Sequence, residues 1–274
     1  MSGADYFRNR PVGRATQAES VARLTLEHPA TIGIKATELS NWLRNRPEDA
    51  PILALRAELI THRRHDVIAL LSAAEAGVRE LGVYLSARDG FALPAAPAEI
   101  LTTLGQAYAE DICVLTPHGD QYVLSGAALC FPNRWRLTDK AGKPILAVHA
   151  PVPDYADKLS SQVDFFLGRL RPGRCYTRSN WGLVSTATLH LPDPVAPVNP
   201  ATDSNFYMRT EDQSFVKLPE SGAVIFTIRT TVTPWSDVPA ADRTTILVQT
   251  QTLNAEWLKY KSINTLSRVR EREG

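Results

Sequence analysis

The chain has 274 residues, 44% of them hydrophobic, and its 30 basic residues against 29 acidic ones leave a formal net charge of +1. That balance argues against a general nucleic-acid or anionic-membrane binder, which needs an excess of Lys and Arg on one face. No apolar run approaches the ~20 residues of a spanning helix, and residues 1–14 lack the apolar centre of a signal peptide. We therefore expect a soluble, cytoplasmic protein without membrane or nucleic-acid partners.

The N-terminal third predicts an arm followed by helices. Residues 1–36 are polar and aperiodic, so we expect an N-terminal arm for which disorder is one reading. A Thr at the start of 37–43 is a plausible N-cap for a short helix, and 56–65 reads as a charged connection. Apolar residues at alternating steps of three and four predict a helix over 66–88 and another over 98–110.

A β-hairpin is predicted next. The runs ICVL at 112–115 and QYVLSGAALCF at 121–131 are apolar and β-leaning, and 117–120 between them has the residues of a turn. A third short apolar run, 144–149, predicts a strand that ends at His149.

On this reading, His149 lies where a strand gives way to a helix. Pro151 and Pro153 stop the strand and hold the chain extended, because proline fixes its own φ and restricts the residue before it. From Asp157 the apolar spacing becomes helical, and Pro172-Gly173 ends that helix. The side chain of His149 is therefore expected on a stiff edge from which it can face a pocket.

The last third predicts a second hairpin and a closing helix. The proline-rich segment 191–200 is a surface crossing, since four prolines suit neither a helix nor a central strand. The β runs 206–218 and 223–232 are joined by turn residues, and 242–260 follows a helical period.

Together these elements predict one domain of the α+β class, over 37–262, with a charged C-terminal tail over 263–274. An antiparallel sheet of about five strands is expected, flanked by helices, with an N-terminal helical region and a closing C-terminal helix. Such a sheet commonly leaves a pocket between itself and its helices.

Standard chemical signatures are absent from the sequence. It contains no GxGxxG after a strand, no GxxxxGK[ST], no GxSxG and no HExxH. Cys113, Cys130 and Cys175 lack CxxC spacing and lie in apolar runs, which predicts buried, reduced thiols.

His149 is the strongest single candidate for a metal ligand, because it ends an apolar strand and its exit is restricted by prolines. A satisfied core histidine is the alternative. Arg134, Arg136 and Lys140 surround Trp135, and they are either a salt-bridged strand end or partners of an acidic ligand group such as a propionate.

Two more groups have both a structural and a functional reading. Trp181 is either core or cofactor wall, and Arg178 and Asn180 beside it need hydrogen-bond partners in so apolar a neighbourhood. Glu211 and Arg229 lie on successive strands of the second hairpin. A cross-strand ion pair would explain them, and a pocket carboxylate that binds an amine is the alternative.

Three segments carry a resemblance to a known family. They are CFPNRWRLTDKAGKPILAVHAPVPDY at 130–155, FFLGRLRPGRCYTRSNW at 165–181 and RTEDQSFVKLPESGAVIFTIRT at 209–230. Together they closely resemble the haem-dependent oxidative N-demethylase-like family, over roughly Leu39 to Lys261.

The resemblance implies a PAS-like fold, a curved antiparallel sheet flanked by helices, that holds haem b. It further implies a monooxygenase that uses dioxygen to remove a methyl group from a small secondary amine and releases formaldehyde. In the characterised branch the amine is dimethylamine, and electrons come from NADPH through flavin and iron–sulfur partner subunits. An external reductase is therefore expected, because this sequence has no flavin, nicotinamide or iron–sulfur signature.

Matched motif by motif, the resemblance also implies a set of site residues. His149 of AVHAPVP would be the axial haem ligand. Glu211 and Arg229, with Gln213, would lie near the distal face as catalytic residues. The residues that would line the haem pocket are Arg134, Trp135, Arg136, Arg178, Asn180 and Trp181.

The sequence departs from the family pattern at two places. Gly182 to Ser185 follow RSNW where a serine and acidic residues are usual, and Asp212 and Val216-Lys217 stand where Arg is usual. The resemblance thus supports haem binding more than it supports dimethylamine as the substrate. Two alternatives follow: a haem-binding or small-molecule PAS-like sensor without turnover, and a structural partner that has lost the cofactor.

Overall fold

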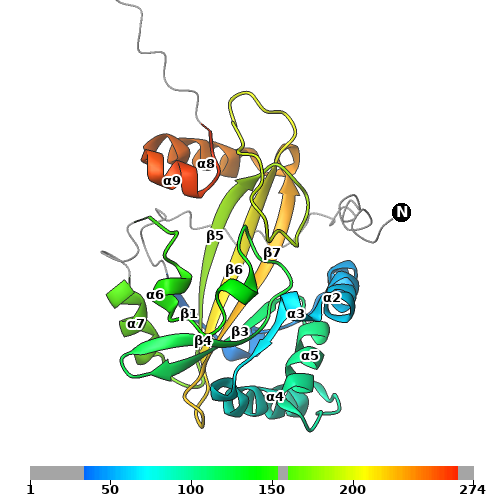
Figure 1. Cartoon of the computed structure of the whole chain (residues 1–274). Coiled ribbons are helices and arrows are strands. Elements are labelled where there is room, and N and C mark those ends of the chain that lie inside the picture. The colour runs from blue at the N-terminus through cyan, green and yellow to red at the C-terminus, as the bar shows by residue number, and fades with distance from the viewer. Residues whose placement is uncertain (1–33, 154–159, 265–274) are drawn as a thin grey trace, which may run out of the picture.

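The computed structural model describes residues 34–153 and 160–264, and a seven-stranded antiparallel sheet organises them (Figure 1). The strand order across the sheet is β1-β5-β6-β7-β3-β4-β2. The strands are β1 (Lys35–Thr37), β2 (Ile68–Leu70), β3 (Asp111–His118), β4 (Gln121–Ala128), β5 (Cys175–Val184), β6 (Tyr207–Lys217) and β7 (Val224–Pro234). The α-helices are α2 (Ala50–His62), α3 (Arg64–Val67), α4 (Glu75–Asp89), α5 (Pro97–Ala107), α6 (Ile145–Val148), α7 (Ser160–Arg169), α8 (Ala240–Thr252) and α9 (Ala255–Tyr260). The predicted α+β class is confirmed.

Both predicted hairpins are present. β3 and β4 are joined by Gly119 and Asp120, and Gly119 has the positive φ of 58° that such a tight turn needs. The turn is shorter than predicted, because Pro117 and His118 belong to β3. The pairing of β6 with β7 runs without a break from Tyr207 opposite Pro234 to Lys217 opposite Val224.

The strand predicted over 144–149 is wrong. Ile145–Val148 forms the one-turn helix α6, and the backbone N–H of His149 donates to the carbonyl oxygen of Ile145 at 3.0 Å. A short apolar run cannot be assigned to a strand or a helix from periodicity alone, and Pro144 suits a helix start because its missing N–H is not needed there. The sheet instead gains β5, which contains RSNW.

Two expectations for the N-terminal region are also wrong. The 37–43 segment begins in β1 and continues as a single 3-10 turn, so Thr37 is a strand residue rather than an N-cap. The segment 56–65, expected as a charged connection, is helical in α2 and α3. Arg56 is fully buried there and bonds Asp111 at 2.6 Å, so its charge marks an internal ion pair rather than contact with solvent.

Three of the four helices predicted from apolar spacing exist with shifted bounds. The helix predicted from Asp66 starts at Glu75, after the edge strand β2, and ends before Gly90, whose φ is 79°. The helix predicted over 98–110 is α5. The start of the next predicted helix, at Asp157, lies outside the described residues, and α7 covers its remaining turns.

The sheet has two faces of different character. One, which we call the α4 face, packs against α4 and α5 through a fully buried cluster that includes Val78, Leu81, Leu104, Val114 and Ile225. The other, the α6 face, is covered by α6 and α7 through Leu124, Leu137, Ile145 and Leu167. In the middle of the α6 face, Tyr176, Phe215 and Phe226 stay only half-buried. The α6 face is therefore the less completely covered side of the sheet.

The C-terminal helices lie at one end of β5, β6 and β7, as Figure 1 shows in orange. Ile246 of α8 and Ile263, which follows α9, share one buried cluster there with Trp181 and Met208. The single helix predicted over 242–260 is broken after α8, and the Asn254 side chain accepts the N–H of Trp257 at 2.9 Å to start α9. Residues 1–33 and 265–274, which include most of the predicted arm and tail, lie outside the described residues.

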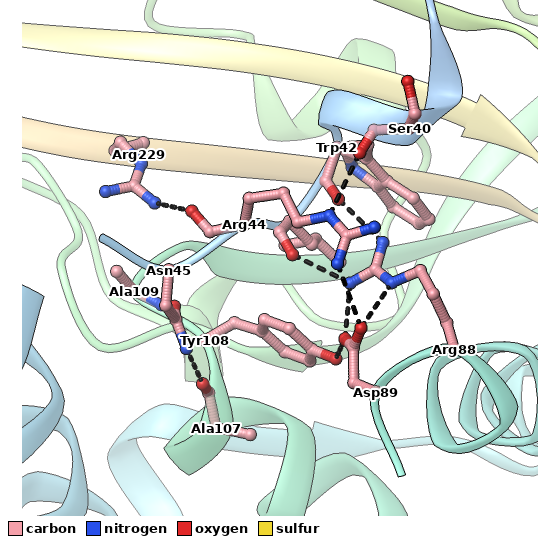
Figure 2. A network of polar contacts seen from close by, with 11 residues as sticks. Ser40, Trp42, Arg44, Asn45, Arg88, Asp89, Ala107, Tyr108, Ala109 and Arg229 are labelled. Carbon is pink, nitrogen blue, oxygen red and sulfur yellow. Dashed lines mark hydrogen bonds and ion pairs between the residues drawn. The ribbon is translucent and has the colours of Figure 1, made fainter. Parts of the chain in front are cut away.

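A polar network attaches the segment after β1 to the helices of the α4 face (Figure 2). Asp89 accepts from Arg88 at 2.6 Å and from the Tyr108 hydroxyl, and Arg44 reaches it at 3.3 Å. Arg88 also donates to the carbonyl oxygens of Trp42 and Leu43 at 2.8 Å. Hydrogen bonding from Arg88 lowers the pKa of Asp89 to about 2.

Cys113, Cys130 and Cys175 are buried free thiols, as predicted. Over the described ranges, the structure has no helix whose length and apolar character would let it cross a bilayer.

Candidate functional site

The strand register divides the predicted site residues between the two faces of the sheet. Glu211 on β6 is opposite Thr230 on β7 and Asn180 on β5, whereas Arg229 is opposite Asp212. Successive side chains of a strand point to opposite faces, so Glu211 lies on the α6 face and Arg229 on the α4 face. The cross-strand ion pair expected between them is therefore wrong.

Arg229 belongs to an ion-pair network of the α4 face. Its guanidinium bonds Asp49 at 2.7 Å and Glu110 at 2.8 Å, and it donates to the carbonyl oxygen of Arg44 at 3.0 Å. Figure 2 shows the last of these bonds, which ties β7 to the segment that carries Arg44 and Asn45. The structure does not bring Arg229 together with the other predicted site residues.

Glu211 is the centre of a group of polar side chains on the α6 face. Its carboxylate lies 3.5 Å from the Arg209 Nε and accepts from the Gln213 amide at 3.2 Å. Across the β5–β6 pairing, Asn180 is opposite Glu211 and Arg178 is opposite Gln213. The sheet therefore delivers these side chains side by side from two strands.

Arg209 holds the loop that follows β4. It is fully buried and donates to the carbonyl oxygens of Leu189 at 3.0 Å and Phe131 at 2.6 Å. Asp111 holds the same loop from the other side, because its carboxylate accepts the backbone N–H groups of Cys130 and Phe131 at 2.7 and 3.0 Å. The buried side chains of Arg209 and Asp111 thus hold the start of CFPNRWRL in place.

Arg134, in that loop, has a left-handed backbone with φ of 62°, an uncommon conformation for a residue with a side chain. Its guanidinium donates to the hydroxyl of Ser262, which also has a positive φ, of 54°. This contact joins the loop to the end of α9. Burial lowers the pKa of Arg134.

The neighbours of Arg134 have different surroundings. Trp135 packs against the cluster beneath α6 and α7. Arg136 is exposed and pairs with Asp193 at 2.5 Å, which matches the salt-bridged reading of this run. The Lys140 ammonium donates to the carbonyl oxygen of Val148 at 2.7 Å and so satisfies the end of α6.

Two residues that the sequence does not mark, Tyr260 at the end of α9 and Lys261 after it, join this group. Lys261 is buried, donates to the carbonyl oxygen of Trp181 at 2.6 Å and lies 4.6 Å from the centre of the Trp181 ring. Burial, with Arg134 and Arg178 nearby, lowers the pKa of Lys261 to about 8. Burial and the charge of Glu211 raise the pKa of Tyr260. No motif marks either residue, since both continue an ordinary helical period.

Trp181 itself lies on the other side of β5 from Arg178 and Asn180. Its ring is in the buried cluster with Leu183 and Met208, so its core reading is the one that the packing matches. Both its carbonyl oxygen and its ring contact Lys261, which links Trp181 to the polar group around Glu211.

His149 joins the same group from the end of α6. Its Nδ1 is 2.9 Å from the carbonyl oxygen of Ile145, so Nδ1 carries the proton and the lone pair falls on Nε2. Burial lowers the pKa of His149, and the charges of Arg178 and Glu211 act on it as well. The imidazole is therefore neutral near pH 7, which is the form that binds metals.

An aromatic surface adjoins these polar residues on the α6 face. Phe215 and Phe226 stack with ring centres 4.7 Å apart, and Phe166 of α7 meets Phe215 edge-on at 5.5 Å. Phe215 is two positions beyond Gln213 on β6 and therefore points to the same face. Half-buried aromatic rings on the same face as a neutral imidazole suit a flat, apolar ligand with a few polar groups.

Two other histidines do not join the site. His118 is exposed at the end of β3. His190 has its Nδ1 2.7 Å from the carbonyl oxygen of Cys130, and its buried Nε2 has no hydrogen-bond partner within the described part of the chain. Among the described residues, no three His, Cys, Asp or Glu side chains gather as a metal-ion site.

Fold and geometry together define an α+β protein with a candidate ligand site on one sheet face, where the described side chains include an imidazole, aromatic rings and more cations than acids. Residues 85–269 match the family described as haem-dependent oxidative N-demethylase, alpha subunit-like. The chain belongs to this family, which confirms the resemblance and suggests an oxidoreductase. None of the curated proteins matches the chain.

The residues present fit the haem that the family name implies. His149 presents one neutral imidazole, Phe215 and Phe226 offer half-buried aromatic rings, and Arg134 and Lys261 are cations that would suit the propionates of a haem. A protein ligand set of one histidine is enough, because the porphyrin supplies the other four ligands.

Proposed function

We propose that the protein is a haem-dependent oxidative N-demethylase that acts on a small secondary amine and releases formaldehyde. The observation that carries this proposal is the meeting of His149, Arg178 and Glu211 on one partly covered sheet face. An imidazole for iron and a carboxylate for a cationic amine are the two groups that such a reaction needs from the protein.

His149 would hold the iron of the haem. The hydrogen bond from its Nδ1 to the Ile145 carbonyl orients the ring and makes Nε2 a stronger electron-pair donor to a metal. This is the usual arrangement of a metal-binding histidine. Its lowered pKa keeps protons from competing for the same nitrogen at neutral pH.

Bound haem, of the b type in this proposal, would supply the activation of dioxygen. In the overall reaction an N-methyl amine, dioxygen, two electrons and two protons give the demethylated amine, formaldehyde and water. The electrons would come from an external flavin and iron–sulfur reductase. The chain's own part is to hold the cofactor and orient the amine.

Glu211 would bind the ammonium group of the substrate, because it is the carboxylate on this face that lies in electrostatic reach of His149. A catalytic role for Arg229 is supported by the family motif alone, because its side chain pairs with Asp49 and Glu110 on the α4 face. Its ion pairs support a structural role.

The arrangement of the sheet supports the PAS-like expectation. Five consecutive strands, β3 to β7, occupy the order β5-β6-β7-β3-β4, so the first strand of the set lies beside the last in the interior of the sheet. The open α6 face of this curved sheet is where a PAS-like domain would hold its ligand. A non-catalytic haem sensor on the same scaffold is the competing function, and turnover separates the two.

The test is to express the protein with ample haem, record its absorption spectrum, reduce it under air with a surrogate donor, and assay formaldehyde after adding secondary amines. Formaldehyde above the haem-free control supports the demethylase. A lasting spectral response to dioxygen without formaldehyde supports the sensor. Absence of a Soret band contradicts both and leaves the structural-partner reading.

A further inference from the structure

Counted over the described residues, the polar group on the α6 face holds more positive than negative charge. Arg134 and Lys261 lie in electrostatic range of Glu211, and Arg209 contacts it at 3.5 Å. Arg178 lies in electrostatic range of Lys261. Of these five side chains only Glu211 is acidic, and Arg209 already lies against it. Asp111, the next acid within reach of Arg209, is held by Arg56 at 2.6 Å.

Two of the cations have neutral groups as their hydrogen-bond partners. Lys261 donates to the carbonyl oxygen of Trp181, and Arg134 donates to the side chains of Asn133 and Ser262. Buried or half-buried cations are costly unless an anion compensates them. The lowered pKa values of Lys261 and Arg134 express the same cost.

The cations come from three separate parts of the chain. Arg134 is on the loop after β4, Arg178 is on β5, and Lys261 follows α9. Arg134 and Ser262, which join the loop to the C-terminal segment, both have a left-handed backbone. Residues with side chains disfavour this conformation, so the surrounding structure must hold the contact in place. Three cations that converge from separate segments, one of them buried, differ from charges scattered on a surface.

We propose that Arg134, Arg178 and Lys261 form a binding site for carboxylate groups beside the Arg209–Glu211 pair. Planar guanidinium groups and an ammonium are well suited to carboxylate oxygens. The inference rests on the proposed function and deepens it. The carboxylates come either from the propionate groups of haem or from a substrate that carries a carboxylate next to its N-methyl amine, as in N-methylglycine.

Lys261→Met is the variant that tests the site, because it removes the charge and keeps most of the side-chain volume. Lys259→Met is the matched control, since Lys259 is exposed in the last turn of α9, two residues before Lys261. Haem and haem dimethyl ester, whose propionates are blocked, are titrated into each apoprotein and followed at the Soret band. N-methylglycine and dimethylamine are then titrated into the haem-loaded proteins.

If the site binds propionates, Lys261→Met weakens haem binding by about tenfold and leaves the ester unaffected. If it binds a substrate carboxylate, haem and ester bind alike, and N-methylglycine perturbs the spectrum of the wild type but not of Lys261→Met. Equal behaviour of wild type, Lys259→Met and Lys261→Met in every titration overturns the proposal.

A second variant guards against a folding defect. Arg134→Met removes a cation that comes from a different part of the chain, and circular dichroism establishes whether each variant is folded. Wild-type protein that binds haem while neither variant differs from it refutes this site but leaves the proposed function standing. Wild-type protein without a Soret band refutes the proposed function, and the site is then tested by thermal shift with N-methylglycine, where equal shifts in all proteins count against it.

Discussion

Glu211 and Arg229 are on adjacent strands, yet their side chains project from opposite faces of the sheet, because Glu211 is in register with Thr230 and Arg229 with Asp212. Glu211 therefore lies with His149 and Arg178, while Arg229 lies with Asp49 and Glu110. Two residues of one sequence motif thus have separable effects, one on ligand binding and one on stability.

Arg229→Gln is expected to lower the free energy of unfolding by about 3 kcal/mol, because it leaves two nearly buried carboxylates without their cation. Urea unfolding measures the loss. Arg171→Gln, at an exposed position, is the control and should be close to neutral. The Soret band of the folded Arg229→Gln protein should match the wild type, and an altered band would place Arg229 in the haem site after all.

Glu211→Gln is expected to weaken binding of a cationic amine by tenfold or more, because a hydrogen bond to a charged group contributes about 1.5 to 3 kcal/mol. Spectral titration of the haem-loaded protein with dimethylamine measures this affinity. Asp212→Asn is the matched control, since Asp212 is the next residue along β6, is exposed and faces the other side. Equal weakening in both variants would contradict the assignment of Glu211.

The stability of the apoprotein should decrease on mild acidification. Burial lowers the pKa of His149 and of His190 below the ordinary 6.5, so the unfolded chain binds more protons than the folded one as the pH falls below about 6.5. Their contribution is complete above that pH and is lost as the pH falls toward their folded pKa values. Unfolding measured from pH 7.5 to 5 should show a smaller slope in His149→Ala than in the wild type.

His149→Ala should also abolish the haem spectrum of the wild type, whereas His118→Ala, at the exposed end of β3, should preserve it. An unchanged spectrum in His149→Ala would reject this residue as the axial ligand without affecting the family assignment.

Lys261→Met is expected to make the apoprotein more stable near pH 7. Burial lowers the pKa of Lys261 from 10.5 to about 8. That shift means that the buried charge of Lys261 destabilises the folded state by about 3 kcal/mol. The variant also loses the hydrogen bond to Trp181, which offsets about 1 kcal/mol of the gain. Thermal unfolding should show the gain.

The pH dependence has a definite sign. Between about 8 and 10.5 the unfolded chain holds the proton of Lys261 more tightly than the folded one, so wild-type stability should rise with pH in that range. Lys261→Met should lack this rise. A variant that is less stable than the wild type at pH 7 would show that the contacts of Lys261 outweigh its burial.

The elements that the sequence predicts well are those whose stability is local. Two β-hairpins carry both the alternating apolar residues and the turn chemistry that define them, and α4, α5 and α7 carry continuous apolar stripes. β5 and α6 were misassigned or missed because neither has a local signal. The strand is polar where it forms the site, and the helix is a single apolar turn that resembles a strand.

Charge was the less reliable guide. Arg56 and Arg209 look like surface residues in the sequence, and both are fully buried because an acid or a set of carbonyl oxygens meets them from a distant part of the chain. Lys261 and Tyr260 could not be predicted as site residues for the same reason, since only the packing of α9 against the end of β5 brings them there.

By itself the sequence determined the α+β class, the family and the residue types available for a haem site, because composition, turn residues and long motifs are properties of the chain in order. Only the tertiary structure decided which of those residues share a face. Side chains of a strand alternate, so a shift of one residue in register exchanges the two faces, and register depends on partners far away in the sequence. Because of this register, Glu211 shares a face with Arg178 and His149, whereas Arg229 lies on the opposite face.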